Sequence, residues 1–220
     1  MTTPPPTPAG ASPKPPQRRV IVGVCGGSAS GKSLLADTLQ ALLGPRAQIL
    51  SQDRYYHDSS HLDPASLAAT NFDHPDAIDM AAFSEDLASL RRGHTIHPPQ
   101  YCFVTHARQP GRSALAPAPV TIVEGLFIYQ LPALRDCYDL RIYVHADSDI
   151  RLLRRIQRDV AQRGRSLAAV AAQYLDTVKP MHEQHVEPNR AYADCVVAPL
   201  DLDQLRATAA ALSAQIASLL

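Results

Sequence analysis

The chain has 220 residues, of which 45% are hydrophobic, and its 21 Lys and Arg are balanced by 21 Asp and Glu. That length is enough for one domain with its own hydrophobic core. A net charge near zero argues against a nucleic-acid coat or a membrane-surface binder, since both usually carry a basic excess. We therefore expect neither nucleic acid nor membrane as a partner.

The four cysteines are scattered without a Cys-x-x-Cys pair, which favours a reducing compartment. The pairs His57/His61 and His182/His185 lack cysteine or carboxylate neighbours at zinc-site spacing, so we expect no structural metal site. No segment approaches the roughly 20 apolar residues that span a bilayer. The N-terminus lacks the apolar core of a secretory signal. These features predict a cytoplasmic protein.

Residues 1–18 are rich in proline and predict a disordered tail, with a proline-rich ligand for a partner domain as the alternative. Residues 19–220 are expected to form one domain in which strands and helices alternate. Strands are expected at 20–24, 47–50, 120–123, 140–144 and 195–197, and helices at 33–43, 79–92, 149–160, 167–178 and 202–219. This alternation predicts an α/β fold, with a central parallel sheet flanked by helices on both faces.

The alternation breaks between residues 95 and 113. The stretches 97–103 and 105–108 predict a small β-hairpin insertion that lies outside the main sheet. Polar aromatic residues in an irregular insertion are typical of the wall of a binding pocket.

A glycine-rich loop lies between the first predicted strand and helix. It reads GGSASGKS and fits the pattern G-x-x-x-x-G-K-[ST]. Its backbone N–H groups can surround phosphate oxygens, and the helix N-terminus adds a partial positive charge. Lys32 supplies a full charge at the outer phosphates, and the Ser33 hydroxyl can ligate Mg²⁺. The predicted nucleotide-binding residues are Gly26, Gly27, Ser28, Ala29, Ser30, Gly31, Lys32 and Ser33.

Two acidic residues follow predicted strands of the sheet. Because the carboxyl ends of parallel strands face the ligand crevice, Glu124 and Asp53 are expected beside the loop. Glu124 is interpreted as a Mg²⁺ ligand, direct or through water, with an ordinary strand-end carboxylate as the alternative. Asp53 is interpreted as the group that orients and deprotonates an acceptor hydroxyl. A helix N-cap or a second Mg²⁺ ligand is the alternative for Asp53.

Arginines are concentrated between residues 151 and 165. Such a run is usually a solvated helix face, but Arg151, Arg155 and Arg158 share one side of the predicted helix, and Gly164 gives the following turn mobility. We interpret residues 155–166 as a helical lid that closes over a triphosphate and brings arginines to the transferring oxygens.

Several motifs in order give a specific resemblance to a known family. They are GGSASGKS, SQDRYYHD, TNFDHPDAID, PQYCFVTHAR, TIVEGLF, RRIQRDVAQRGR, QYLDTVKPMHEQHVEP and YADCVV. Through them, residues 20–197 resemble the uridine kinase (uridine–cytidine kinase) family of P-loop kinases. The resemblance implies transfer of the γ-phosphoryl of ATP or GTP to the 5′-hydroxyl of uridine or cytidine in pyrimidine salvage. It also implies Mg²⁺ as a cofactor and a homo-oligomer, commonly a tetramer.

The resemblance also implies roles for individual residues. Asp53 matches the catalytic base, with Lys32, Arg158 and Arg163 as further catalytic residues, and Ser33, Glu124 and Asp53 lie on the metal side. The implied substrate-binding residues are Tyr56, Asp73, Tyr101, His106, Arg108, Arg155, Arg165 and Gln173. Among these, Asp73 matches the ribose ligand, and Tyr101 and His106 match the residues that contact the pyrimidine. The turn at residues 198–201 departs from the family pattern, so no residue near adenine is assigned.

Two other functions are consistent with a phosphate loop in this fold. The first is a phosphoribulokinase-like or pantothenate-like kinase of the same fold, and the second is a non-catalytic nucleotide switch. A sugar phosphate would require additional basic residues in the acceptor pocket, and a switch needs neither Asp53 nor an arginine lid. The combination of Asp73, Tyr101 and His106 therefore favours a nucleoside acceptor. Without the family pattern, a Tyr and a His five positions apart would be ordinary surface residues.

Overall fold

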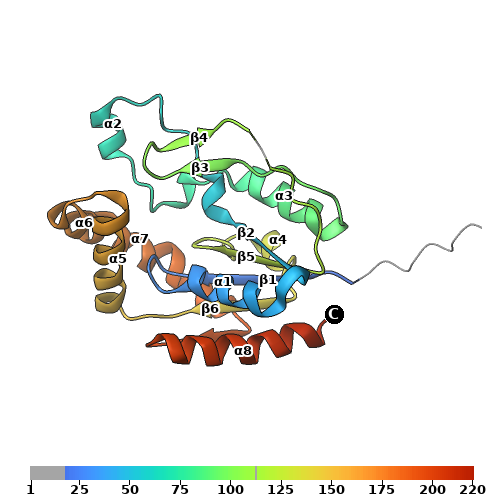
Figure 1. Ribbon diagram of the computed structural model, residues 1–220. Coiled ribbons are helices and arrows are strands. Elements are labelled where there is room, and N and C mark those ends of the chain that lie inside the picture. Colours follow the sequence, from blue (N-terminus) through green and yellow to red (C-terminus); the bar gives the residue numbers. More distant parts are fainter. Residues whose placement is uncertain (1–17, 112) are drawn as a thin grey trace, which may run out of the picture.

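A computed structural model describes residues 18–111 and 113–220, so the predicted proline-rich tail lies outside the described residues except for Arg18. The centre is a five-stranded parallel sheet in the order β2-β5-β1-β6-β7 (Figure 1). Its strands are β1 (Val20–Gly26), β2 (Ala47–Ser51), β5 (Val120–Gly125), β6 (Leu140–Val144) and β7 (Cys195–Val197). The predicted α/β architecture is confirmed.

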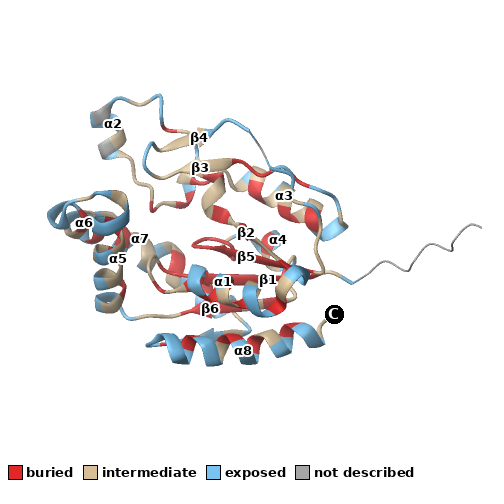
Figure 2. Ribbon diagram, viewed as in Figure 1, coloured by how far each residue is buried: buried red, intermediate tan, exposed pale blue. Residues whose placement is uncertain are grey.

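Helices cover both faces of the sheet, as expected, and Figure 2 shows the buried residues concentrated between the layers. One face carries α1 (Lys32–Leu43) and α8 (Leu202–Ser218), whose buried side chains pack against the strands. The apolar face of α1 consists of Leu35, Leu39 and Leu43, together with Ala36. Leu34 and Leu42, which also follow the helical spacing of the leucines in this segment, are 44% and 52% exposed.

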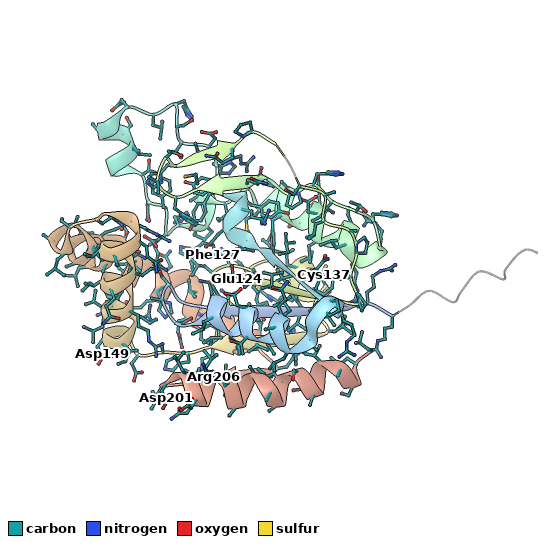
Figure 3. All side chains as sticks on the ribbon, in the orientation of Figure 1. Glu124, Phe127, Cys137, Asp149, Asp201 and Arg206 are labelled. Carbon is teal, nitrogen blue, oxygen red and sulfur yellow. The ribbon has the colours of Figure 1, made fainter. Side chains whose placement is uncertain are left out.

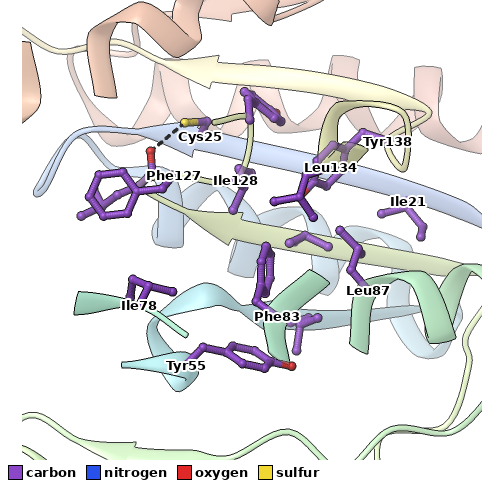
Figure 4. Close-up of a cluster of buried hydrophobic side chains, with 14 of the residues drawn as sticks. Ile21, Cys25, Tyr55, Ile78, Phe83, Leu87, Phe127, Ile128, Leu134 and Tyr138 are labelled. Carbon is purple, nitrogen blue, oxygen red and sulfur yellow. Dashed lines mark hydrogen bonds between the residues drawn. The ribbon is translucent and has the colours of Figure 1, made fainter. Parts of the chain in front are cut away.

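The other face of the sheet carries α3 (Met80–Arg92) and the short α4 (Pro132–Arg135). Figure 4 shows the aromatic core on this side, in which Tyr55, Phe83 and Phe127 are fully buried. Within it, the Cys25 thiol donates a hydrogen bond of 3.3 Å to the Leu126 carbonyl. Burial raises the pKa of this thiol to about 12, so Cys25 acts as a small packing residue. All four cysteines are free.

The segment between α3 and β5 contains the predicted hairpin. Strands β3 (Gln100–Cys102) and β4 (Ala107–Gln109) pair antiparallel outside the main sheet. A short helix before α3, α2 (Pro64–Ala69), carries no long apolar period and was not predicted; the Asp63 carboxylate caps its N-terminus. Short 3₁₀ segments lie at Gly44–Arg46, Gln52–Tyr55 and Pro75–Ala77.

The C-terminal half extends the predicted helices. Helix α5 (Ser148–Arg163) is longer than the 149–160 expected from the sequence. The helix expected at 167–178 consists of α6 (Leu167–Gln173) and a π-helical turn (Tyr174–Val178). The chain then continues through α7 (Lys179–Met181), a second π turn (His182–Val186) and a 3₁₀ segment (Glu187–Tyr192). The π turns flank Pro180, which has no N–H for an ordinary helical hydrogen bond. Within the described part of the chain, no helix is long and apolar enough to cross a membrane.

Candidate active site

The loop between β1 and α1 is shaped to hold an anion. Gly31 is the N-cap of α1 with a φ of 103°, a conformation that favours glycine, and no side chain caps the helix. The first N–H groups of α1 are therefore available to a ligand, and the helix dipole favours a negative charge there. Ala29 has a φ of 62°. Among the described residues, Ala29 and His106 are the non-glycine residues with positive φ, and both belong to this site.

Two of the predicted metal-side residues, Ser33 and Glu124, meet at the carboxyl end of β5. Glu124 lies in the interior of the fold (Figure 3) and is 5% exposed. Its Oε2 accepts a hydrogen bond of 2.9 Å from the Ser33 hydroxyl and lies 3.9 Å from Nζ of Lys32. Its Oε1 accepts a hydrogen bond from the Ser51 hydroxyl at the end of β2. Strands β2 and β5 pair directly, which brings these groups together.

Asp53 lies in the 3₁₀ turn that follows β2, and its position is set by its neighbours. Its backbone N–H donates to the Ser51 hydroxyl at 3.3 Å. The neighbouring Gln52 side chain is buried and accepts from the Phe127 N–H at 2.9 Å, which anchors the turn to the sheet. Burial, followed by repulsion from Glu124, raises the pKa of Asp53, while Lys32 opposes the shift. A carboxyl group with a raised pKa is a stronger proton acceptor once it is ionised.

A cavity of about 670 Å³ opens beside this turn. The predicted site residues that line it are Ser28, Lys32, Asp53, Tyr56, Asp73, Tyr101, His106, Arg155, Arg158, Arg163, Arg165 and Gln173. They come from the phosphate loop, the turn after β2, the segment between α2 and α3, the hairpin, helices α5 and α6, and the turn between these two helices. The structure thus gathers side chains from distant parts of the sequence around one chamber.

One wall of the cavity is aromatic. The rings of Tyr56 and Tyr101 lie 5.2 Å apart, and Phe72 stacks on His106 at 4.5 Å. The Tyr101 hydroxyl lies 3.4 Å from Nδ1 of His106. Burial, followed by Arg165, lowers the pKa of His106, which favours the neutral imidazole with its one donor and one acceptor. Burial raises the pKa of Tyr101 to about 12, so its hydroxyl keeps its proton.

The facing wall is polar. Asp73 is 9% exposed and accepts a hydrogen bond of 3.1 Å from the Thr177 hydroxyl. Arg155 lies 3.8 Å from this carboxylate, and it also donates to Ser28 Oγ and to Gln173 Oε1, at 2.9 Å each. Burial raises the pKa of Asp73 even though Arg155 opposes the shift. Arg165 donates to the same Gln173 oxygen.

Arg108 does not line the cavity. Its guanidinium donates to the backbone carbonyl of Tyr56 at 2.9 Å and to that of Tyr55 at 3.3 Å, and it pairs with Asp79 at 3.2 Å. These contacts join the hairpin to the turn after β2. The cavity is also not lined by Glu124, by Ser33 or by the remaining residues of the phosphate loop.

Two residues at the site were not assigned from the sequence. His182 lies behind the phosphate loop, and its Nδ1 would be 2.8 Å from a Cβ on Gly27, so a glycine is needed there. Its Nε2 lies 3.4 Å from Glu187, and burial, followed by Arg151, lowers its pKa to about 4. Asp159 is fully buried among the arginines of α5. Both residues fall within the motifs quoted above. Their positions in the sequence follow no pattern that would separate a buried residue from an exposed one.

His182 and His185, which stand three positions apart, have separate neighbours. His185 packs edge-on against the His74 ring at 4.9 Å, while His182 pairs with Glu187. Within residues 18–111 and 113–220, no group of three or more His, Cys, Asp or Glu side chains could hold a metal ion by itself.

The chain is similar to known proteins over most of its length. Residues 21–205 match the model of the phosphoribulokinase/uridine kinase family. The chain belongs to this family. Its relatives include uridine kinases from Staphylococcus haemolyticus (44% identity, 80% of this chain and 86% of the relative) and Alkaliphilus metalliredigens (42%, 82% and 87%). Phosphoribulokinase from Rhodobacter spheroides has a similar fold, with a TM-score of 0.59 and 16% identity over 84% of this chain and 72% of that one.

Proposed function

We propose that the protein is a uridine kinase, which transfers the γ-phosphoryl of ATP or GTP to the 5′-hydroxyl of uridine or cytidine and yields UMP or CMP. One observation carries the proposal. A single cavity is lined by Lys32 of the phosphate loop, by Asp53, and by the Tyr101–His106 pair. The curated relatives, named uridine kinases and more than 40% identical over most of the chain, support the same activity.

The donor triphosphate is expected on the backbone of the phosphate loop. Lys32 then neutralises charge on the outer phosphates, and the arginines of α5 and its C-terminal turn, which line the same cavity, are expected to contact the transferring group. In a loose phosphoryl-transfer transition state, negative charge spreads over the equatorial oxygens, so these cations stabilise it more than they stabilise the ground state.

The Ser33 and Glu124 side chains fit a magnesium ion. A hydroxyl and a carboxylate joined by a hydrogen bond of 2.9 Å are oxygen donors of the kind that Mg²⁺ prefers, and Mg²⁺ keeps several waters and phosphate oxygens as its remaining ligands. A bound Mg²⁺ would neutralise charge on the phosphates. Asp53 adds a nearby carboxylate that can hold a metal-bound water.

Asp53 is proposed as the catalytic base. It lines the cavity together with Lys32, so a nucleoside whose 5′-hydroxyl points at the loop would present that hydroxyl to the carboxylate. Asp53 accepts the hydroxyl proton as the oxygen attacks the γ-phosphorus and the bond to the leaving diphosphate oxygen breaks. Its raised pKa suits the task of accepting that proton.

The nucleoside is proposed to lie between the aromatic and polar walls. Asp73 and Gln173 offer oxygen acceptors for the ribose hydroxyls. Hydrogen bonds from ribose would replace those that Asp73 now accepts from Thr177 and Gln173 from Arg155. The Tyr101 ring gives a face on which a pyrimidine stacks, and the neutral His106 provides a donor and an acceptor to its edge. Arg108 is proposed to act indirectly, because its contacts position the hairpin against the turn that holds Asp53.

A panel of acceptors tests the proposal. Purified protein would be incubated with Mg²⁺ and ATP, or GTP, and with uridine, cytidine, thymidine, ribulose 5-phosphate or pantothenate. We expect UMP and CMP as products and no phosphorylation of ribulose 5-phosphate or pantothenate. Phosphorylation of either of those two would favour the other kinases of this fold, and slow ATP hydrolysis alone would favour a nucleotide switch. A cytoplasmic location, a role in pyrimidine salvage and a homotetramer are further parts of this proposal, and size-exclusion chromatography with light scattering tests the last.

A further inference from the structure

Asp159 is a charged residue of α5 with no solvent exposure. Its Oδ1 accepts a hydrogen bond of 2.8 Å from Nε of Arg158. Three further guanidinium groups lie at ion-pair distance from the carboxylate: Arg155 at 3.5 Å, Arg163 at 3.6 Å and Arg165 at 3.7 Å. Burial of a charge is costly unless the charge is paired, so this carboxylate is stabilised by arginines in place of water.

The position of Asp159 differs from that of its partners. All four arginines line the cavity, whereas Asp159 lies behind them and does not. Two of the arginines, Arg163 and Arg165, flank Gly164, where α5 ends. The backbone carbonyl of Asp159 also accepts hydrogen bonds from the N–H groups of Gly164 and, at 3.2 Å, Arg165. One residue therefore fixes both the turn and the side chains that flank it.

The arginines would not gather in this way by themselves. Four like charges in one corner repel one another, and burial followed by Arg158 lowers the pKa of Arg163. Asp159 offsets one of the four charges and Asp73, 3.8 Å from Arg155, offsets part of another, which leaves a net positive charge to attract a polyanion. Its Oδ2 makes no hydrogen bond within the described residues and is held by charge alone, with Arg155 at 3.5 Å and Arg165 at 3.7 Å.

We propose that Asp159 is the positioning residue of this arginine cluster, Arg155, Arg158, Arg163 and Arg165. It holds the four guanidinium groups toward the cavity before a triphosphate enters and so lowers the cost of arranging them around the transferring phosphoryl group. The inference rests on the proposed function, because it takes a nucleoside triphosphate as the anion. Asp159 itself touches neither substrate.

Kinetics of two variants test this role. Asp159→Asn keeps the shape and the backbone carbonyl but removes the charge, and Asp159→Glu keeps the charge but moves it by one methylene. The matched control is Asp203→Asn, which breaks an exposed pair with Arg206 in α8. Measured well below each unfolding midpoint, kcat of Asp159→Asn should fall at least tenfold, which is a larger factor than the rise in KM for uridine that follows from Arg155 and Arg165. The Glu variant should lie between wild type and Asn.

Limited proteolysis provides a measurement that needs no acceptor. Trypsin cleaves after Arg163 and Arg165 only when the turn opens, so loss of the carboxylate should speed cleavage at these two bonds at least fivefold, as followed by mass spectrometry. The rate should be unchanged in Asp203→Asn. If Asp159→Asn does not fold, the same two measurements on the Glu variant decide the question.

The outcomes separate the two proposals. An Asp159→Asn enzyme with kcat within twofold of wild type, or with unchanged cleavage at Arg163 and Arg165, overturns the positioning role even if its unfolding midpoint is lowered. A wild-type protein that phosphorylates no pyrimidine nucleoside overturns the proposed function, while the proteolysis arm still decides the role of Asp159.

Discussion

The Ser33 hydroxyl donates a hydrogen bond of 2.9 Å to the Glu124 carboxylate, although the two residues are 91 positions apart. The bond joins the first turn of α1 to the carboxyl end of β5 and thereby fixes the phosphate loop relative to the sheet. Because both groups are oxygen donors, a metal ion that bridges them to phosphate would compete with this hydrogen bond and replace it.

Replacement of Glu124 should therefore change the magnesium dependence of the reaction. Glu124→Gln keeps the volume of the side chain and removes its charge, so we expect the Mg²⁺ concentration for half-maximal rate to rise at least tenfold. A rate titration with MgCl₂ at fixed ATP measures this. Glu85→Gln, on the exposed side of α3, is the control. An unchanged magnesium curve would remove Glu124 from the metal side.

Replacement of Asp53 should abolish most of the activity without unfolding the protein. General base catalysis typically contributes about 10²–10⁴-fold, so Asp53→Asn should lower kcat by that factor with little change in either KM. The unfolding midpoint should not fall, because burial already disfavours the charged form of Asp53. Thermal unfolding and steady-state kinetics would be measured together, and a variant with wild-type kcat would contradict the assignment.

The same carboxylate predicts the acid side of the pH profile. The active form of a base is deprotonated, and the pKa of Asp53 is raised from 3.8 by burial and by Glu124. The rate should consequently decline, as pH falls, at a pH above the ordinary aspartate value. The acid limb of kcat/KM should disappear in the residual activity of Asp53→Asn. If that limb persists in the variant, another group controls it.

The Tyr101 ring should contribute to nucleoside binding in particular. Stacking of a base on an aromatic ring is worth about 1–3 kcal/mol, so Tyr101→Ala should raise KM for uridine about 5- to 150-fold and leave KM for ATP nearly unchanged. Tyr101→Phe keeps the ring and removes only the contact with His106, and serves as the matched control. Equal increases in both KM values would point to a general collapse of the hairpin.

His182 should make the folded state sensitive to acid. Its pKa is 6.5 when unperturbed and about 4 in the folded protein, so between these values the unfolded chain binds a proton that the folded protein does not. Stability is therefore unaffected above pH 6.5 and is lost as pH falls toward 4, by an amount on the order of 1–3 kcal/mol. Denaturant unfolding at several pH values measures the loss. His182→Gln should reduce the slope, and an unchanged slope would contradict the prediction.

The sheet and the long helices could be predicted because their apolar residues repeat with a clear period. β1 is a continuous apolar run, β5 begins with the mostly apolar stretch Val120–Val123, and α3 has a regular buried face at Phe83, Leu87 and Leu90. The helical period of the leucines did not show which of them face inward in α1, since Leu34 and Leu42 follow this period almost as well as Leu35. α2 and α4 are too short for a period, and the π turns depend on Pro180 and on tertiary packing.

The candidate site was predictable where a motif carries its own chemistry, as in the phosphate loop, and where the family pattern supplied positions such as Asp73 and His106. Asp159 and His182 were missed for a physical reason. A charged residue in a basic helix and a histidine without metal-site neighbours are usually solvated, and only the fold shows that Asp159 is fully buried and that the His182 side chain is 11% exposed. Arg108 was assigned to the substrate, but its guanidinium binds the backbone carbonyls of Tyr55 and Tyr56. These two residues are distant in the sequence, so only the fold shows the contact.

The cavity is continuous from Lys32 to His106, without a wall between the loop and the aromatic side. A conjugate in which a nucleotide and uridine are tethered through a chain of phosphates should therefore occupy both halves at once. Since one association event would then bring both recognition groups into place, such a conjugate should bind far more tightly than either half alone. It would also hold the enzyme in a single closed form suited to crystallisation.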